Sequence, residues 1–540
     1  MSSLMRTPNR HTSHLLEAVL PAPIGGLNVS SSYDNMQPNQ ALVMDNFVPL
    51  SSSVELRRGF KPHAGKMNFT PKTIIPYHNL KGEDRFFAFG ENELIEISKK
   101  RDYNIFGIDY IRKLNALVPD GVFSNGTINW VQFKDRLFLV NGIDEPKVYI
   151  PDETGEGYGV FKNFSFEAEG LTLATLKNVF VSKQRLWFIE KNSMRVWYTK
   201  NAGEVQGQLL SFDMSAVSSF SGHLVAGASW TQDGGEGMDD LTCFITSQGE
   251  VLVYKGIDPN DADNWTLKGV YKMAAPLGDR CLLKYHGDLI LLSKEGFIPL
   301  SKALPLEGAS ASLFSFSANV NTLIEERASL YGQKQGWQAH LYPKGGLALF
   351  NTPTSRGYEQ FICNTSTGAW ARFTGIKAHD FVLFNDRLYF ASDDGVYLFD
   401  EGFSDNGIPI QGRIEQAFTN FSSAKQKRVT LLNPRIKASH PIALNIYMNT
   451  DFDTHQKPYE TLLSDYAESP WNEMKWSTKK EVSSSEGTSS AKWATLSGMA
   501  RSVWIATLAT GTYFSLALST KTKGTPVKVF STSVRYEKAS

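Results

Sequence analysis

The sequence has few cysteines and no long apolar run. Its three cysteines, Cys243, Cys281 and Cys363, are far apart and odd in number. Their spacing fits neither a disulfide framework nor a zinc site, so we expect three buried, unpaired thiols. No run of about 18 apolar residues is present, and the short apolar segment 15–20 contains Glu17, so we expect neither a membrane-spanning helix nor a signal peptide. The sequence predicts a soluble chain made in a reducing compartment.

The chain also lacks a net charge. Lys and Arg number 55, equal to Asp and Glu at 55. A protein that coats nucleic acid is strongly basic, so the composition argues against that class. A neutral chain still fits a pore through which DNA slides. Such a pore must not bind DNA tightly, and a strongly basic lining would hold it. The hydrophobic content of 41% excludes a disordered chain, and 540 residues predict about two to four domains.

Common enzyme signatures are missing. No Gly-rich segment runs into Gly-Lys-Ser/Thr, and no serine lies in a Gly-x-Ser-x-Gly context. His11 and His14 are close in sequence, but a solvated pair in a polar N-terminal segment is favoured over a metal site. We therefore predict no enzyme activity, no catalytic or metal-binding residue and no cofactor.

Two acidic clusters are candidate sites. The cluster of Asp258, Asn260, Asp261 and Asp263 fails the spacing of a calcium loop and is typical of a turn. Segment 233–240, which contains Asp239 and Asp240, is acidic enough for a glycosidase-like carboxylate pair. A solvated loop, or one that docks a neighbouring subunit, is favoured there.

A short phrase recurs along the middle of the chain. It consists of a strand, a polar turn and a second strand, and it is clearest at 130–142, 179–189 and 381–391. From 70 to 405 we count about seven such units, with a short helix expected at 318–330. Arrays of hairpins hide their edges by radial closure, so the pattern predicts a β-propeller.

The regions on either side of the repeats have a different residue pattern. Residues 1–21 predict a flexible arm, and residues 22–69 an extended N-terminal segment that docks on neighbours, with Leu27, Phe47 and Leu56 as possible inter-subunit anchors. Residues 406–540 predict a C-terminal β-rich domain resembling a β-sandwich. The fold class is thus mainly β, with a propeller-like array at 70–405. Deletion of residues 1–62 is expected to leave soluble protein that assembles weakly.

One basic group is a candidate nucleic-acid contact. Lys425, Lys427 and Arg428 lie close together in sequence. Three positive charges are a weak signal for DNA or partner contact, and an ordinary solvated face is favoured.

Several ordered phrases together resemble one known family. They are Gly25-Gly26-Leu27-Asn28, Asp45-Asn46-Phe47-Val48-Pro49, Val54-Glu55-Leu56-Arg57-Arg58-Gly59-Phe60, Asn141-Gly142 with Asp144-Glu145-Pro146, Thr246-Ser247-Gln248-Gly249-Glu250-Val251, Asn364-Thr365-Ser366-Thr367-Gly368-Ala369-Trp370 and Val534-Arg535-Tyr536-Glu537. In this order they resemble the tail hub proteins of short-tailed phages, also called nozzle, tail tubular or packaged-DNA-stabilisation proteins. The resemblance spans most of residues 22–540.

The resemblance implies a structural virion protein of the phage tail, made in the host cytoplasm. Such subunits form a hexameric ring below the portal and adaptor rings. The ring continues the channel for double-stranded DNA, retains packaged DNA, docks fibres or spikes and conducts DNA at ejection. Several relatives are built around a β-propeller, and the family has no catalytic residues. The alternative is a propeller glycosidase or polysaccharide-binding tail protein used for host attachment.

Overall fold

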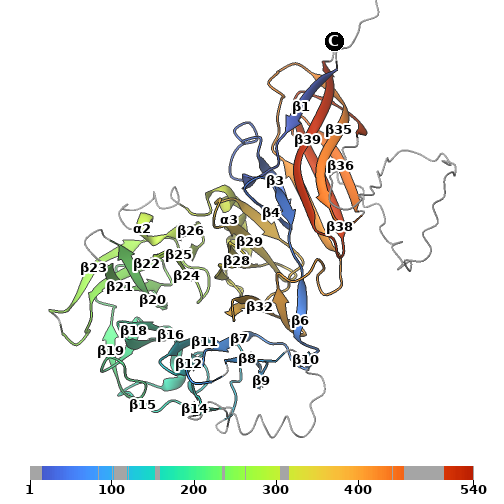
Figure 1. Cartoon of the computed structure of the whole chain (residues 1–540). Helices are drawn as coiled ribbons and strands as arrows, with labels where there is room; N and C mark the ends of the chain where they lie inside the picture. The colour runs from blue at the N-terminus through green and yellow to red at the C-terminus, as the bar shows by residue number, and fades with distance from the viewer. Residues whose placement is uncertain are drawn as a thin grey trace, which may run out of the picture. The chain divides into compact units, whose positions relative to one another are not determined.

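The chain forms two compact units (Figure 1). The computed structural model describes residues 15–82, 84–99, 101–102, 118, 121–152, 159–233, 238–261, 263–303, 315–440, 442–454 and 504–538. One unit, Arg58–Ile408, is here called the propeller unit. The other is made from Met1–Arg57 and Pro409–Ser540 and is called the terminal unit. The propeller unit is thus inserted between the two halves of the terminal unit.

The described strands of the propeller unit form seven blades of three or four antiparallel strands each (Figure 1). Neighbouring hydrogen-bonded strands are antiparallel within each blade, as the hairpin repeat predicts. The strands are, in blade 1, β7 (Thr73–Tyr77), β8 (Arg85–Gly90) and β9 (Glu93–Glu96); in blade 2, β11 (Asn129–Phe133), β12 (Arg136–Val140), β13 (Lys147–Ile150) and β14 (Val160–Asn163); in blade 3, β16 (Leu176–Ser182), β17 (Arg185–Glu190), β18 (Arg195–Thr199) and β19 (Gly207–Asp213); and in blade 4, β20 (Leu224–Asp233), β21 (Met238–Thr246), β22 (Glu250–Gly256) and β23 (Trp265–Lys272).

The remaining blades complete the ring. They are blade 5, with β24 (Leu282–Tyr285), β25 (Asp288–Ser293) and β26 (Gly296–Pro299); blade 6, with β27 (Gln338–Tyr342), β28 (Leu347–Pro353), β29 (Tyr358–Asn364) and β30 (Trp370–Phe373); and blade 7, with β31 (Asp380–Phe384), β32 (Arg387–Ser392), β33 (Gly395–Phe399) and β6 (Phe60–Gly65). Two short strands, β15 (Phe166–Glu167) and β10 (Arg101–Asp102), pair in parallel with β19 and β6.

Helical segments are short. The expected helix at 318–330 is confirmed as η3 (Ala318–Val320) followed by α3 (Asn321–Tyr331), between blades 5 and 6. The other described helical segments are η1 (Leu173–Thr175) and α2 (Leu300–Ala303).

The repeated phrase makes tight two-residue turns. In blade 3, Lys183 and Gln184 both have positive φ, and in blade 7 so do Asn385 and Asp386. Both turns have the backbone of a type I′ turn, which matches the twist of the strands that it joins. Arg185 follows the blade 3 turn as the first residue of β17, and its side chain is buried. It is 5% exposed, and its Nη2 lies 3.0 Å from Asp258 Oδ1.

A strand from the N-terminal part of the chain closes the propeller. β6 pairs with β33, with Phe60 opposite Phe399 and Ala64 opposite Val396. The predicted extended segment at 22–69 is therefore divided, because its last strand is the fourth strand of blade 7. The pairing joins the start of the propeller unit to its end, so the first and last blades are held together without a covalent link.

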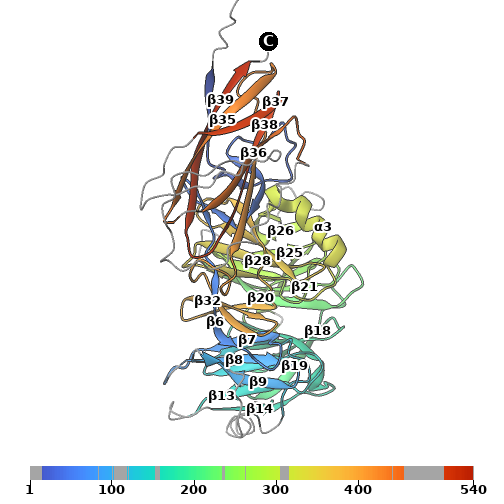
Figure 2. The ribbon, with the colours of Figure 1, turned by 90° about the vertical axis from the view of Figure 1, so that its right-hand side faces the viewer.

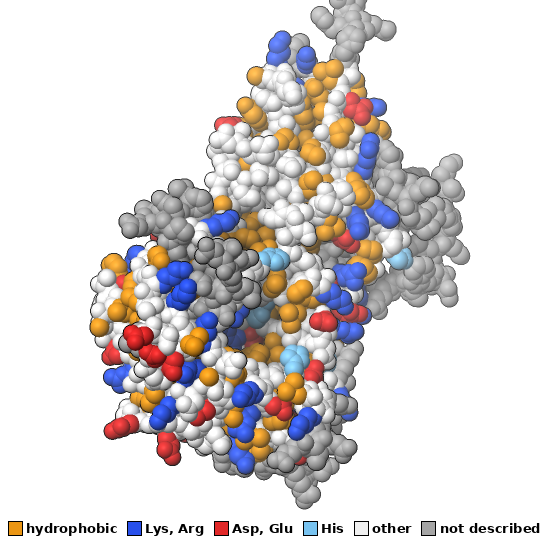
Figure 3. Space-filling view, turned by 60° about the vertical axis from the view of Figure 1, so that its left-hand side comes forward, with side chains coloured by type: hydrophobic (Ala, Val, Ile, Leu, Met, Phe, Trp, Pro, Cys, Tyr) orange, Lys and Arg blue, Asp and Glu red, His pale blue; other side chains and the backbone are white. Residues whose placement is uncertain are grey.

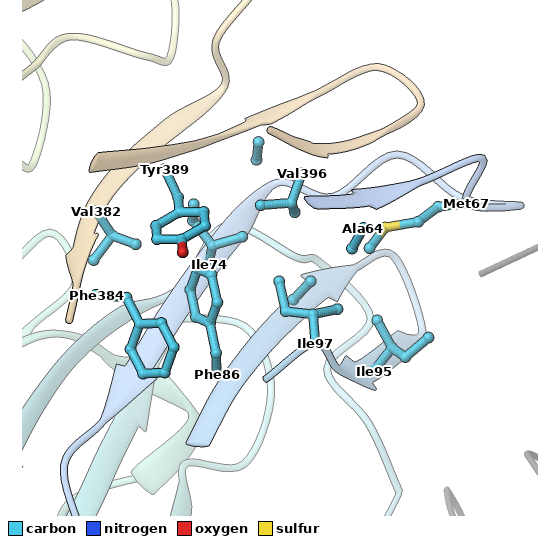
Figure 4. Close-up of a cluster of buried hydrophobic side chains, with 12 residues drawn as sticks. Ala64, Met67, Ile74, Phe86, Ile95, Ile97, Val382, Phe384, Tyr389 and Val396 are labelled. Atoms are coloured by element: carbon cyan, nitrogen blue, oxygen red, sulfur yellow. The ribbon is translucent and has the colours of Figure 1, made fainter. Parts of the chain in front are cut away.

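The seam between blades 1 and 7 is sealed by apolar packing (Figure 4). Ile74 and Phe86 of blade 1 pack with Phe384 and Val396 of blade 7. The Phe86 and Phe384 rings stack with centroids 4.7 Å apart. Burial of such large side chains is the main favourable contribution to closure.

The terminal unit is a β-sandwich that uses both ends of the chain (Figure 2). Its described strands form one sheet with β37 (Ile505–Gly511), β35 (Lys427–Ala438), β39 (Val527–Lys538), β5 (Val54–Leu56) and β4 (Phe47–Pro49), and another with β2 (Gly26–Leu27), β3 (Gln40–Asp45), β34 (Ile410–Gln416), β38 (Phe514–Thr522) and β36 (Ala443–Thr450). Side chains from both sheets meet in one core, among them Leu432, Val534, Met448 and Leu516.

The N-terminal region differs from the predicted arm. β1 (Leu16–Leu20) runs antiparallel to β39, with Leu16 opposite Tyr536. Leu20 is 4% exposed and belongs to the sandwich core. The alternation of Leu16, Ala18 and Leu20 places the apolar side chains on one face of the strand. Residues 1–14, with His11 and His14, lie outside the described residues.

Candidate functional site

An arginine at the centre of the propeller unit connects five blades. Arg280 precedes β24 of blade 5, and its Nη1 donates to Asp380 Oδ1 of blade 7 at 2.7 Å and to Gln338 Oε1 of blade 6 at 3.1 Å. Its Nη2 donates to the Ile128 carbonyl beside blade 2 at 2.6 Å and to Thr73 Oγ1 of blade 1 at 3.4 Å. The planar guanidinium carries five donors in a fixed geometry, which suits a hub between several strands.

Asp380 is the charged partner of this hub. Its side chain is 3% exposed, and its Oδ2 accepts the Ile74 amide at 2.9 Å. Burial raises the pKa of Asp380, while Arg280 and the Ile74 amide oppose that rise. A buried carboxylate needs such partners, because desolvation disfavours its charged form.

The other two blades are tied to the hub through Asn178. Its Nδ2 in blade 3 donates to the Val225 carbonyl of blade 4 at 3.1 Å and to the Asp279 carbonyl at 3.2 Å. Lys177, the preceding residue, lies 2.8 Å from Asp279 Oδ1. Polar contacts near the axis therefore link all seven blades.

Two cavities share this hub. An inner chamber of about 240 Å³ and an outer vestibule of about 730 Å³ are both lined by Asn129, Asp279 and Arg280. The inner chamber lies among the innermost strands of the blades, whose residues line it. The vestibule is lined by residues that precede or begin those strands and by turns between outer strands, among them the turns that contain Ser247 and Lys294. A vestibule of this size falls in the range of small-molecule sites.

His340 faces the inner chamber. Its Nε2 is buried and has no hydrogen-bond partner among the described residues, although part of the residue is exposed to the cavity. Burial lowers the pKa of His340 to about 3, and the nearby Arg280 charge acts in the same direction. The imidazole is therefore neutral at neutral pH.

Two more histidines line the vestibule. Burial lowers the pKa of His223, and Lys177 adds to that effect. Burial also lowers the pKa of His379, although its Nε2 lies 2.9 Å from Asp393 Oδ1. Within the described ranges, no group of three or more His, Cys, Asp or Glu side chains is placed to hold a metal ion.

The vestibule is basic, although the whole chain is neutral. Its described lining includes five Lys or Arg side chains and one carboxylate, Asp279. The basic residues are Lys72, Lys177, Arg280, Lys294 and Lys334. Basic side chains border a hollow in the propeller unit in Figure 3. The local excess of positive charge favours anions.

The basic group predicted from the sequence is not one surface patch. Lys425 and Arg428 are exposed, but Lys427 is 0% exposed. Its Nζ donates to the carbonyls of Ser423 and Lys425, both at 2.6 Å, and burial lowers its pKa. Lys427 thus stabilises a turn of the terminal unit, and its ammonium group is not free to meet a phosphate.

The proposed inter-subunit anchors are buried within their own chain. Leu27, Phe47 and Leu56 are 2%, 0% and 3% exposed. A Cβ built on Gly412 would lie 2.5 Å from Phe47 Cε2 and 2.6 Å from Leu56 Cδ1, which shows how closely β34 covers these two side chains. These residues anchor the segment inside the subunit, because its strands pair with strands of the C-terminal half.

The acidic cluster near Trp265 is a turn, as the sequence predicts. Asp258 Oδ1 accepts the Asn260 amide at 3.0 Å, and Asp261 Oδ1 accepts the Asp263 amide at 3.0 Å. Asp258 also pairs with Arg185. For the second cluster, residues 234–237 and the side chains of Asp239 and Asp240 lie outside the described residues.

The three cysteines are buried and unpaired, which confirms that prediction. Burial raises the pKa of Cys281 and of Cys363 to about 12, and it raises the pKa of Cys243 as well. All three are therefore protonated and unreactive at neutral pH. Among the residues described, the helices are all too short or too polar to cross a membrane.

Comparison with known proteins finds similar solved structures at low identity and no family. No family model and no curated protein matches the chain. Similar solved structures include a proposed 6-phosphogluconolactonase from Bacteroides fragilis, at 13% identity over 64% of this chain and 90% of that one, with a TM-score of 0.31. An exo-β-1,3-galactanase from Phanerochaete chrysosporium aligns at 12% identity over 75% and 95%, with a TM-score of 0.27. Raptor from Chaetomium thermophilum aligns at 10% identity over 63% and 28%, with a TM-score of 0.37.

Proposed function

We propose that the chain is a structural subunit of the tail hub of a short-tailed phage. About six copies would form a ring, consistent with closed symmetric assembly. The ring would lie below the portal and adaptor rings, continue the channel for double-stranded DNA, retain packaged DNA, dock fibres or spikes and conduct DNA at ejection. Its location would be the virion tail.

The observation that carries the proposal is the role of the asparagines in the family-like phrases. Asn28 Oδ1 accepts the amides of Ser30 and Ser31 at 3.2 and 3.1 Å. Asn364 Oδ1 accepts those of Ser366 and Thr367 at 2.9 and 3.3 Å. Such side-chain bonds to the following backbone fix turns.

A third asparagine acts in the same way, and a fourth joins two segments of the chain. Asn141 Oδ1 accepts the amides of Ile143 and Asp144 at 3.0 and 2.9 Å. Asn46 Nδ2 donates to the Gln411 carbonyl at 2.8 Å, and its Oδ1 accepts from Arg57 Nε at 2.8 Å. The phrases that carry the resemblance thus shape turns and join strands. The structural roles of these residues favour a building block over an enzyme.

The interior of the propeller also bears on the path of DNA. The inner chamber measures about 240 Å³, and the Arg280–Asp380 pair lies beside it. The major groove of B-DNA is itself about 12 Å wide, so a duplex cannot enter this chamber. In the proposed ring, the DNA channel runs between subunits and not through the axis of each propeller.

Co-assembly tests the proposal. Purified full-length chain is mixed with the portal and adaptor rings of the same phage, and the product is imaged by electron microscopy. We expect an added ring at the end of the portal–adaptor stack. A chain that stays monomeric and never joins the stack would contradict the proposal.

The enzymatic alternative has its own test. A propeller glycosidase would release sugar from host surface polysaccharides, and Asp239→Asn with Asp240→Asn would abolish that turnover. Turnover that depends on these two residues would favour the enzyme. We expect no turnover above background for the wild-type chain.

A further inference from the structure

We propose that the vestibule of the propeller unit binds a small anionic saccharide, one that bears a carboxylate or a phosphate. This goes beyond the tail-hub proposal, which assigns no ligand to the propeller. The unpaired charges of the vestibule, the polar side chains between them and the size of the site all fit such a ligand.

Most cations of the vestibule already have a partner. Lys177 lies 2.8 Å from Asp279, and Arg280 lies 2.7 Å from Asp380. Lys334 Nζ donates to the Thr354 carbonyl at 3.0 Å. These groups hold the site in shape, and their charges are at least partly compensated.

Two lysines of the vestibule are not compensated. Lys72, just before β7, and Lys294, in the turn between β25 and β26, form no ion pair with a described residue. Lys72 is half-buried, and its charge lies close enough to His379 to lower the pKa of that histidine. Lys294 is exposed, and both ammonium groups can form a charge-assisted hydrogen bond with a ligand of opposite charge. A carboxylate or phosphate in the vestibule would supply that charge.

Neutral polar groups lie between the charges. Gln335, Thr127, Ser221, Ser247 and Tyr358 line the vestibule and can exchange hydrogen bonds with hydroxyl groups. The lysines can bind an acidic group at one end of a ligand, and the amide and hydroxyl side chains can bind its remaining polar groups. This combination suits an anion that carries hydroxyl groups. A saccharide with an acidic group has that chemistry.

The shape favours a short ligand over a polymer that passes through. The vestibule and the inner chamber of about 240 Å³ share Asn129, Asp279 and Arg280 in their linings. A site of about 730 Å³ fits one or two sugar rings.

Calorimetric titration of the full-length chain tests this proposal. The probes are glucuronate, glucose as its neutral counterpart, and inorganic phosphate as a competitor. The variants are Lys72→Gln with Lys294→Gln, and Lys268→Gln as a matched control. Lys268 is an exposed lysine of β23 that does not line the vestibule.

We expect glucuronate to bind, glucose to bind about tenfold more weakly or not at all, and phosphate to displace glucuronate. The double variant should lose about tenfold or more in affinity, and Lys268→Gln should bind as the wild type does. All three proteins should share one melting temperature, because the changed lysines are at least partly exposed.

Three results would overturn the proposal. The first is no binding of glucuronate at up to about 10 mM, which corresponds to negligible affinity. The second is a double variant that binds as the wild type does. The third is phosphate that fails to displace glucuronate, which would remove the role of charge. None of these involves ring assembly, so the result is independent of the tail-hub proposal.

Discussion

Arg280 and Asp380 come from blades 5 and 7 and form an ion pair with an Nη1–Oδ1 distance of 2.7 Å. Their side chains are 26% and 3% exposed. A buried pair of this kind is weak support for stability as a whole, but removal of one partner leaves an uncompensated charge. The hub should therefore be sensitive to single substitutions.

Arg280→Met should destabilise the propeller unit by about 3 to 5 kcal/mol, because Asp380 is left buried and unpaired. Adding Asp380→Asn should recover part of the loss, since the amide oxygen still accepts from Ile74. Differential scanning calorimetry measures both changes.

The control for this prediction is an exposed ion pair. Lys61 and Glu401 are 3.4 Å apart and 53% and 46% exposed. Lys61→Met should cost less than about 1 kcal/mol. An Arg280→Met effect no larger than this control would show that the hub does not hold the blades together.

Gly59 directly precedes β6, the strand that completes blade 7. A Cβ at this position would lie 1.9 Å from the Ser404 carbonyl oxygen, and the Gly59 amide donates to the Gly402 carbonyl at 3.0 Å. Gly59→Ala must push these backbones apart, and we expect a loss of about 3 kcal/mol. Faster proteolysis of the propeller unit would report the loosened closure.

A matched glycine separates this effect from loss of flexibility. Gly222→Ala would meet only the side chains of Ser247 and Gln248, at 2.8 and 3.1 Å, and these can move. It should leave proteolysis nearly unchanged. Equal effects at Gly59 and Gly222 would argue against a closure role for Gly59.

His340 should make the fold acid-sensitive. Its pKa in the folded chain is about 3, below its ordinary value of 6.5. As pH falls below 6.5, His340 is protonated in the unfolded chain but stays neutral in the folded chain. The free energy of unfolding therefore decreases from about pH 6.5 toward pH 3. The slope is at most about 1.4 kcal/mol per pH unit.

The comparison of melting temperatures between pH 7 and pH 5 isolates this histidine. His340→Leu should lose less stability than the wild type over that range, because Nε2 has no described partner to lose. The raised pKa of Asp380 acts in the opposite direction near pH 4, and it is common to both proteins. His78→Leu, at an exposed site, should behave as the wild type does.

Deletion of residues 1–62 now has a different expected outcome. The deletion removes β1 to β5 from the terminal unit and the first residues of β6 from blade 7. Both units would lose paired strands, so we expect insoluble protein where the sequence predicted a soluble one. Deletion of residues 1–14 keeps every described strand and should leave the chain soluble. The soluble fraction after expression distinguishes the two.

Local patterns account for what could be predicted. The hairpin phrases and the helix at 318–330 depend on residues close in sequence, and their periodicity predicts them. The closure of blade 7 and the shared sandwich depend on pairs such as Phe60 with Phe399 and Leu16 with Tyr536. Such pairs leave no local pattern. The sequence alone therefore predicts that the N-terminal segment docks on a neighbouring subunit.

The candidate site was missed for the same reason. Arg280 lies in a short link before β24 that reads as an ordinary turn. Its partners Thr73, Ile128, Gln338 and Asp380 are separated from it by between 58 and 207 positions. Each of these residues begins or precedes the innermost strand of a blade. Their equivalent positions in the repeat are the one sequence signal that could have grouped them. Only the ring brings these positions together.

The mass of the purified full-length chain tests the central proposal most directly. Native mass spectrometry, with negative-stain images of the same sample, reports the number of copies and the presence of a central opening. The tail-hub proposal predicts closed rings of about six copies, alone or once the adaptor ring is added. A chain that remains a 60.2 kDa monomer under both conditions would contradict it.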